Sequence, residues 1–178
     1  MALSPSCSPA TEQFGVDLNG KPISSLGGPG VRVVVLVFAA SDCPISNRYV
    51  PEIARLNKEF GPQGVRIWWV YPNPGDDAKV IVEHNRNFQI HEDALIDSFQ
   101  SLVNRAHVTV TPEVAVFTAA MQEVYHGRID DRYISLGQEH PQASHHDLEL
   151  AITAALDRKP VPPPTGPTVG CSIVFLQK

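Results

Sequence analysis

The chain has 178 residues, of which 43% are hydrophobic and 19% are charged. This balance predicts a single domain with a core of its own, and no apolar run is long enough to span a membrane. The net charge is −5, and the 14 basic residues are scattered along the sequence. Nucleic acid and anionic membrane surfaces are therefore not expected as partners.

The first predicted elements are a hairpin and a buried strand. Residues 1–13 are rich in serine and proline, and we expect them to be loose. Residues 14–26 alternate apolar and polar side chains around Asn19-Gly20, a dipeptide typical of tight turns, which predicts a small hairpin. Residues 31–38 form a valine-rich apolar run, which is typical of a central strand covered on both faces.

A helix is predicted immediately after Cys43. Pro44 suits the first helical turn, where its missing N–H is not needed. Gly61-Pro62 ends the helix. The apolar stripe is formed by side chains at helical spacing, namely Tyr49, Ile53, Leu56 and Phe60.

This position favours a reactive thiol at Cys43. The start of a helix offers unpaired N–H groups and the positive end of the macrodipole, and both stabilise a thiolate. Asp42 acts in the opposite direction, because a neighbouring carboxylate raises the pKa of a thiol unless it caps the helix or pairs with Arg48. The alternative interpretation is an inert, half-buried cysteine.

Strands and helices then alternate, which predicts parallel strand pairing. Residues 65–71 are a second buried strand. Asp76-Asp77 are expected to cap a helix that ends near Phe88 and carries Val80, Ile81 and His84 inward. A short strand over residues 94–96 and a helix over residues 99–107 follow.

The last third begins at Thr111-Pro112, which we expect at the entrance of a strand. We expect the peptide bond between these two residues to be cis. Residues 114–117 and 123–125 are predicted to form an antiparallel hairpin. Ser144 is expected to cap a final helix over residues 145–159. Beyond it, residues 159–178 hold a proline-rich segment that predicts an extended arm carrying Cys171.

Three cysteines, Cys7, Cys43 and Cys171, are too few for a disulfide scaffold in a chain of this length. Their odd number leaves at least one thiol unpaired, so redox chemistry is favoured over structural cross-links.

The N-terminal sequence shows no basic region followed by an apolar stretch. We expect a cytoplasmic location, or a periplasmic one if an export signal was trimmed.

The order of elements and three landmarks resemble the thioredoxin-like superfamily, in particular its redoxin, or AhpC/TSA-like, branch. The landmarks are the strand-Cys-helix unit VFAASDCPIS, the Thr111-Pro112 loop and the helix that follows GRIDDRY. The segment DCPISNRYVPE is also similar to a bacterial subgroup that combines Asp-Cys-Pro with a C-terminal Gly-Cys.

The resemblance implies an α/β thioredoxin-like fold. Its central mixed sheet is flanked by helices, and the hairpin and the proline-rich arm are additions at the two ends. The thioredoxin-like domain is expected to cover residues 14–158 and the arm residues 159–178.

The resemblance also implies roles for individual residues. Cys43 stands where the nucleophilic cysteine of a thioredoxin active site stands. Ser46 fills the place of the second cysteine of a Cys-x-x-Cys motif, so the usual local disulfide cannot form. Thr111, before Pro112, is expected to present its backbone to an incoming peptide. Arg48 is expected to favour the thiolate and to contact substrate.

Cys171 is a candidate resolving thiol. The residues that follow the last helix can stretch about 40 Å at most, which is enough to cross a small domain. The alternative is a free thiol in a loose tail. Cys7 has no patterned surroundings and is interpreted as an incidental exposed thiol.

The sequence therefore predicts a thiol-dependent oxidoreductase that acts by thiol–disulfide exchange through Cys43, resolved by Cys171, with no cofactor. The expected partners are a protein or small-molecule disulfide or a hydroperoxide, and an external thiol reductant. One alternative is an antioxidant peroxiredoxin-like hydroperoxide reductase, although the positions for its proline and hydroxyl residue hold Leu36 and Ala40.

A second alternative is a non-catalytic or copper-binding thioredoxin-like protein. The adjacent histidines His145 and His146 invite a metal site, together with His140. Adjacent residues on a helix point in different directions, and no His-x-x-x-His or Cys-x-x-x-Cys pair is present. No metal ligands are therefore expected.

Overall fold

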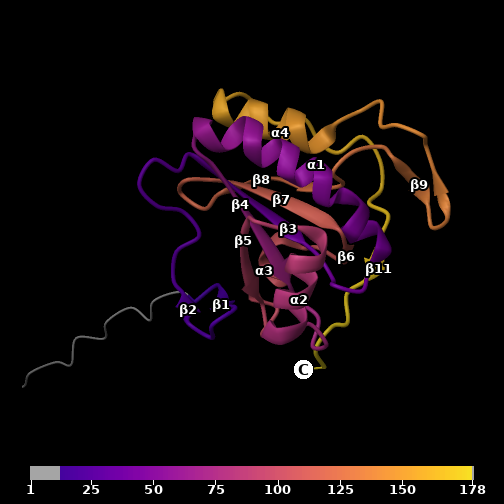
Figure 1. Cartoon of the computed structure of the whole chain (residues 1–178). Coiled ribbons are helices and arrows are strands. Elements are labelled where there is room, and N and C mark those ends of the chain that lie inside the picture. Colours follow the sequence, from indigo (N-terminus) through magenta and orange to yellow (C-terminus); the bar gives the residue numbers. More distant parts are fainter. Residues whose placement is uncertain (1–12, 178) are drawn as a thin grey trace, which may run out of the picture.

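A computed structural model describes residues 13–177, and its centre is a seven-stranded mixed sheet (Figure 1). The strands in chain order are β1 Gly15–Asp17, β2 Pro22–Ile23, β3 Val33–Phe38, β4 Val65–Tyr71, β5 Asp93–Ile96, β7 Glu113–Thr118 and β8 Glu123–Gly127. Their order across the sheet is β2-β1-β5-β4-β3-β7-β8. Strands β3, β4 and β5 run parallel, and the remaining pairs are antiparallel.

Helices cover both faces of this sheet. They are α1 Pro44–Phe60, α2 Ala78–Phe88, α3 Ser101–Ala106 and α4 Asp147–Leu156, and a 3-10 turn, Gly61–Gln63, follows α1. Apolar residues of α1, α2 and α4 belong to one core cluster, and those of α3 belong to the other. α1 and α4 lie side by side (Figure 1), joined by an ion pair between Arg55 and Glu149.

β3 takes the central position because it is apolar on both faces. All of its residues are buried. Side chains alternate across a strand, so the odd-numbered residues of β3 pack with α1, α2 and α4, and the even-numbered residues pack with α3. The predicted central strand is thus confirmed, and its C-terminal end leads directly to Cys43.

The predicted N-terminal hairpin is also present, as β1 and β2 pair in an antiparallel arrangement. The β7–β8 hairpin is confirmed as well. The loop between β8 and α4 holds a further hairpin that the sequence did not indicate, formed by β9 Tyr133–Ser135 and β10 Gln138–Glu139.

Two expectations about the helices are wrong. Ser144 does not cap α4, which starts at Asp147 after His146. Instead, the Asp131 carboxylate accepts from the backbone N–H groups of Ser144 at 2.7 Å and of His145 at 3.0 Å. Val80 does not point inward and is 39% exposed. Ile81 and His84 are three residues apart and share the buried face of α2, whereas Val80 lies about 100° away around the helix.

The proline-rich arm returns to the sheet end that carries Cys43. Its strand β11, Cys171–Ser172, pairs with β6, Val110–Thr111, in an antiparallel arrangement. The segment predicted to be loose lies outside the described residues except for Gln13, and Cys7 lies outside them too. No helix within residues 13–177 combines the length and the apolar character needed to cross a membrane.

Replacing Asp97 by alanine is expected to lower the free energy of unfolding by about 2–3 kcal/mol. Asp97 is 1% exposed and accepts hydrogen bonds from the backbone N–H groups of Ser101, Leu102 and Val103 at the start of α3. Asp77→Ala is the matched control, because this exposed cap accepts one N–H, from Val80, and should cost only about 1 kcal/mol. Chemical denaturation measures both, and equal losses would contradict the expectation.

Candidate active site

Cys43 is the N-cap residue of α1, directly beyond the end of β3. Its side chain is 1% exposed, and its thiol donates to the carbonyl oxygen of Thr111, with Sγ and O 3.1 Å apart. The sulfur therefore lies at the C-terminal edge of the parallel strands, where ligands of such sheets usually bind. Pro44 occupies the first helical turn, as expected.

The arm places Cys171 beside this sulfur. In the β11–β6 ladder Cys171 is the direct partner of Thr111, the residue whose carbonyl the Cys43 thiol contacts. The two thiols are close enough for a hydrogen bond between their side chains. Both cysteines are free in this structure, so it represents the reduced form.

The two thiols have opposite pKa shifts. Burial alone would raise the pKa of Cys43, but hydrogen bonds from Cys171 and from the backbone and hydroxyl of Ser46 outweigh it and lower this pKa. Burial raises the pKa of Cys171, and together with the hydrogen bond and negative charge of Cys43 and the charge of Asp42 it brings this pKa to about 12. Cys43 is therefore the thiol that ionises, and Cys171 is the one that keeps its proton.

Ser46 lies next to the sulfur in the first turn of α1. It is fully buried, and its Oγ has no conventional hydrogen-bond partner among residues 13–177. The neutral Cys43 thiol makes no capping hydrogen bond to the helix. The ionised sulfur can accept from Ser46, which explains why this residue lowers the pKa of Cys43.

Thr111 contacts both cysteines. Besides accepting from Cys43, it donates its hydroxyl to the carbonyl oxygen of Cys171 at 3.4 Å. The Thr111–Pro112 peptide bond is cis. Gly170 packs so closely on this loop that a Cβ there would collide with the Thr111 carbonyl. Sequence reasoning missed this role of Gly170, because the constraint is visible only when the opposing backbone is known.

A buried polar network supports the loop that carries Cys43. Asp76 accepts from the backbone N–H of Ser41 at 3.1 Å and also from its hydroxyl. Asn47 donates to the Ser41 carbonyl at 3.4 Å and meets His84 Nε2 at 2.7 Å. Burial lowers the pKa of His84. The loop is thus held in place from α1 and from α2. The sequence pattern indicated an inward-facing His84 but not the rest of this network.

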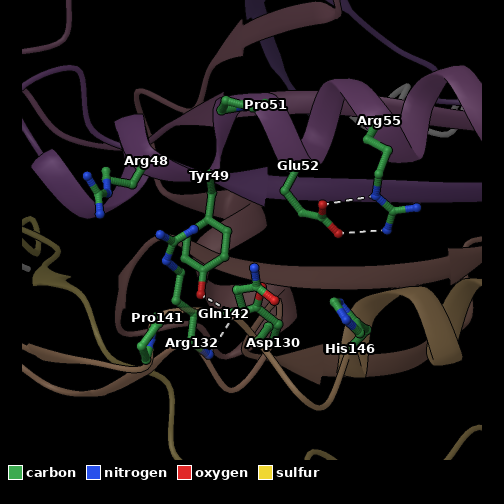
Figure 2. Close-up of a pocket in the computed structure, with 11 residues that line it drawn as sticks. Arg48, Tyr49, Pro51, Glu52, Arg55, Asp130, Arg132, Pro141, Gln142 and His146 are labelled. Carbon is green, nitrogen blue, oxygen red and sulfur yellow. Dashed lines mark hydrogen bonds and ion pairs between the residues drawn. The ribbon is translucent and has the colours of Figure 1, made fainter.

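The structure places Arg48 elsewhere. Its guanidinium pairs with Glu139 of β10 at 2.9 Å, so the pairing with Asp42 that the sequence left open is not formed. Arg48 lies at one end of a cavity of about 540 Å³ between α1 and the loop before α4 (Figure 2). In this cavity Tyr49 donates to Asp130 at 2.5 Å. Burial raises the pKa of Asp130.

A grouping of metal-ligand type lies at the edge of this cavity and is formed by Glu52 and His146 of its lining together with Glu149. Arg55 pairs with both carboxylates (Figure 2 shows its two contacts with Glu52), so a cation there would compete with the guanidinium. In the part of the chain that the structure describes, this group includes neither Cys43 nor Cys171. It therefore gives no support to a copper site at the thiols.

One known family matches the chain. A model described as "AhpC/TSA family" matches residues 9–122, which is more than half of the chain. The chain belongs to the AhpC/TSA family. Among proteins with curated descriptions, none matches the chain.

Solved structures show that this AhpC/TSA chain has the thioredoxin-like fold. A hypothetical protein of Sinorhizobium meliloti 1021 aligns with a TM-score of 0.78 at 20% identity, over 99% of this chain and 98% of its own. A secreted disulfide oxidoreductase of Mycobacterium tuberculosis has a TM-score of 0.55 at 15% identity, over 83% and 96%. A thioredoxin-like protein of Aeropyrum pernix has a TM-score of 0.55 at 19% identity, over 66% and 80%.

The structure thus brings together five of the six residues that the sequence pointed to. These are Cys43, Ser46, Cys171, Thr111 and Pro112. The family and the fold support thiol-based redox chemistry.

Replacing Ser46 by alanine is expected to raise the pKa of Cys43 by about one unit, because the thiolate loses a buried hydroxyl donor. The midpoint of thiolate formation then moves to higher pH. Thiolate ultraviolet absorbance of the reduced chain, in a Cys7→Ser background, measures this shift. Ser135→Ala is the control, since this exposed hydroxyl contacts only Gln138. An unchanged midpoint in Ser46→Ala would show that the hydroxyl has no influence on the sulfur.

Proposed function

We propose that the chain is a thiol–disulfide oxidoreductase in which Cys43 and Cys171 form one redox pair. The observation that carries the proposal is the β11–β6 ladder, which brings Cys171 onto the Cys43 sulfur. The opposite pKa shifts of the two thiols give them different tasks. The fold shared with a secreted disulfide oxidoreductase agrees with this chemistry.

The first step is attack by Cys43. Its thiolate bonds to one sulfur of a substrate disulfide, the disulfide bond breaks, and the second substrate sulfur leaves as a thiolate that takes a proton from water. Ser46 favours the thiolate before the attack, because its hydrogen bonds help to lower the pKa of Cys43. The product is a mixed disulfide between Cys43 and the substrate.

The second step belongs to Cys171. Its pKa is raised partly by the negative charge and hydrogen bond of Cys43, and both disappear when Cys43 enters the mixed disulfide. Cys171 then loses its proton more easily and attacks the Cys43 sulfur. The bond between Cys43 and the substrate breaks, a Cys43–Cys171 disulfide forms, and the substrate sulfur that was bonded to Cys43 leaves as a thiolate that takes up a proton. Two electrons have moved to the substrate, and an external dithiol reverses the change in the protein.

This pairing replaces the local motif that the chain lacks. Ser46 occupies the position where a second cysteine would stand one helical turn from Cys43. The arm supplies that thiol from the opposite side, across Thr111. A distant resolving thiol must be delivered by docking, so we expect the arm contacts to influence turnover.

Cys43→Ser is expected to abolish reduction of a small aromatic disulfide, because the remaining described thiol, Cys171, has a pKa raised to about 12. Cys171→Ser is expected to stop after one step and accumulate the mixed disulfide, seen as a mass increase of one substrate half on Cys43. Cys7→Ser serves as the control and should turn over normally with excess dithiol. Continued multiple turnover in Cys171→Ser would remove Cys171 from the mechanism.

A parallel reaction with hydroperoxide separates the two redox alternatives. Leu36 and Ala40 stand where the peroxidase pattern requires a proline and a hydroxyl residue, and both are buried and apolar. We expect peroxide consumption to be slow compared with disulfide reduction. Rapid Cys43-dependent consumption of peroxide, with slow disulfide exchange, would favour a peroxiredoxin instead.

Oxidation is expected to stabilise the folded chain by about 2–5 kcal/mol, because a Cys43–Cys171 bond closes a long loop and restricts the unfolded state. Denaturation of the oxidised and reduced forms measures the difference. The Cys171→Ser variant should have the same stability under oxidising and under reducing conditions. A lower stability of the oxidised wild-type chain would indicate that the disulfide does not fit the docked arm.

A further inference from the structure

We infer that the arm occupies the edge where a substrate peptide binds, and that the arm's own sequence shows which peptide fits. The substrate class is an extended polypeptide segment with glycine immediately before its reacting cysteine and an aliphatic residue two positions after it. This inference rests on the proposed function and adds a substrate preference to it.

The first support is the hydrogen bonding along β6. The arm lies antiparallel to this strand, with Cys171 opposite Thr111 and Ser172 opposite Val110. The backbone N–H of Ile173 donates to the Thr109 carbonyl at 3.2 Å. These are backbone contacts, so any extended segment of another chain can make them in place of the arm.

The second support is the lack of space at Gly170. A Cβ at this position would meet the carbonyl group of Thr111 and the nitrogen of Pro112. These atoms are backbone and cannot rotate away. A segment that presents its cysteine at the place of Cys171 therefore needs glycine just before it.

The third support is the depth at which Ile173 is buried. It is 4% exposed and belongs to the core cluster that includes Leu102 and Val103 of α3. Ser172, before it, is exposed, and Val174, after it, is 60% exposed. The edge thus selects one apolar side chain, two positions beyond the cysteine, and leaves its neighbours free.

The fourth support is steric. With the arm docked, Cys43 is 1% exposed, and an external disulfide has no path to its sulfur. The end of the arm must leave before the first step and return for the second. A peptide substrate and the arm therefore use the same edge in turn, and the returning arm displaces the reduced peptide.

The arm contacts are suited to this exchange. The backbone N–H of Thr165 donates to the buried carboxylate of Asp147 at 2.8 Å, and this contact anchors the proline-rich part of the arm to α4. Beyond Ile173 the end is held by three hydrogen bonds: Gln100 donates to the Val174 carbonyl at 2.7 Å and accepts from the Leu176 N–H at 3.0 Å, and Asn73 accepts from the Val174 N–H at 3.0 Å. Residues beyond the anchor can release while the arm stays attached to the domain.

Three synthetic peptides test the preference. The first has the sequence of residues 167–174, Pro-Thr-Val-Gly-Cys-Ser-Ile-Val. The second carries alanine in place of its glycine, and the third carries serine in place of its isoleucine. Each is prepared as a mixed disulfide with an aromatic thiol, whose release as a coloured thiolate reports bond formation between Cys43 and the peptide sulfur.

The reaction uses the full chain with Cys7→Ser and Cys171→Ser, so that it stops at the mixed disulfide. The first peptide is expected to react about tenfold faster, or more, than either changed peptide, as the loss of one buried aliphatic side chain implies. Equal rates for the three peptides would overturn the inference. The symmetrical disulfide of the aromatic thiol alone serves as a reference: if it too fails to react, the proposed function fails instead.

Adding Gly170→Ala to the same chain tests the competition between arm and peptide. The new Cβ should weaken docking of the arm, so all three peptides should react faster while their order is kept. Gln100→Ala removes a contact of the arm end without entering the edge and should act in the same direction. Unchanged rates in both variants would overturn the inference. It would also be overturned if two copies of the chain exchanged their arms and the resulting dimer did not react with the peptides.

Discussion

The chemistry of this chain depends on the docking of one short strand, β11, against the loop that faces Cys43. While this strand is docked, the hydrogen bond from Cys171 helps to lower the pKa of Cys43, although burial acts in the opposite direction. With it, two thiols of opposite proton affinity share one buried site. Burial, which normally disfavours a thiolate, is compensated here by neighbours that donate hydrogen bonds.

The part of the site built by local sequence could be predicted. The valine-rich run gave the central strand, and Pro44 gave the start of α1, so the position of Cys43 followed from residues next to one another in the chain. The family resemblance added Thr111 and Pro112. Each of these inferences rests on a strand, a turn or the start of a helix. Such elements have short sequence patterns that can be recognised without knowing the rest of the fold.

The rest of the site depends on contacts between distant segments. A proline-rich arm has no hydrophobic period, so its sequence does not say where Cys171 will dock. Arg48 was expected near the thiolate, but its partner Glu139 lies in a hairpin that no pattern indicated. Gly170 carries a strict packing constraint that comes entirely from the backbone of Thr111.

The anchor between Thr165 and Asp147 has a thermodynamic consequence. By keeping the arm tethered, this anchor sets the effective molarity of Cys171 around Cys43. The effective molarity in turn affects the equilibrium between the reduced dithiol and the oxidised form with a Cys43–Cys171 disulfide. A hydrogen bond remote from either sulfur thereby contributes to the reduction potential of the pair. Loosening that tether would make the oxidised form a stronger oxidant, even though the atoms that exchange electrons stay the same.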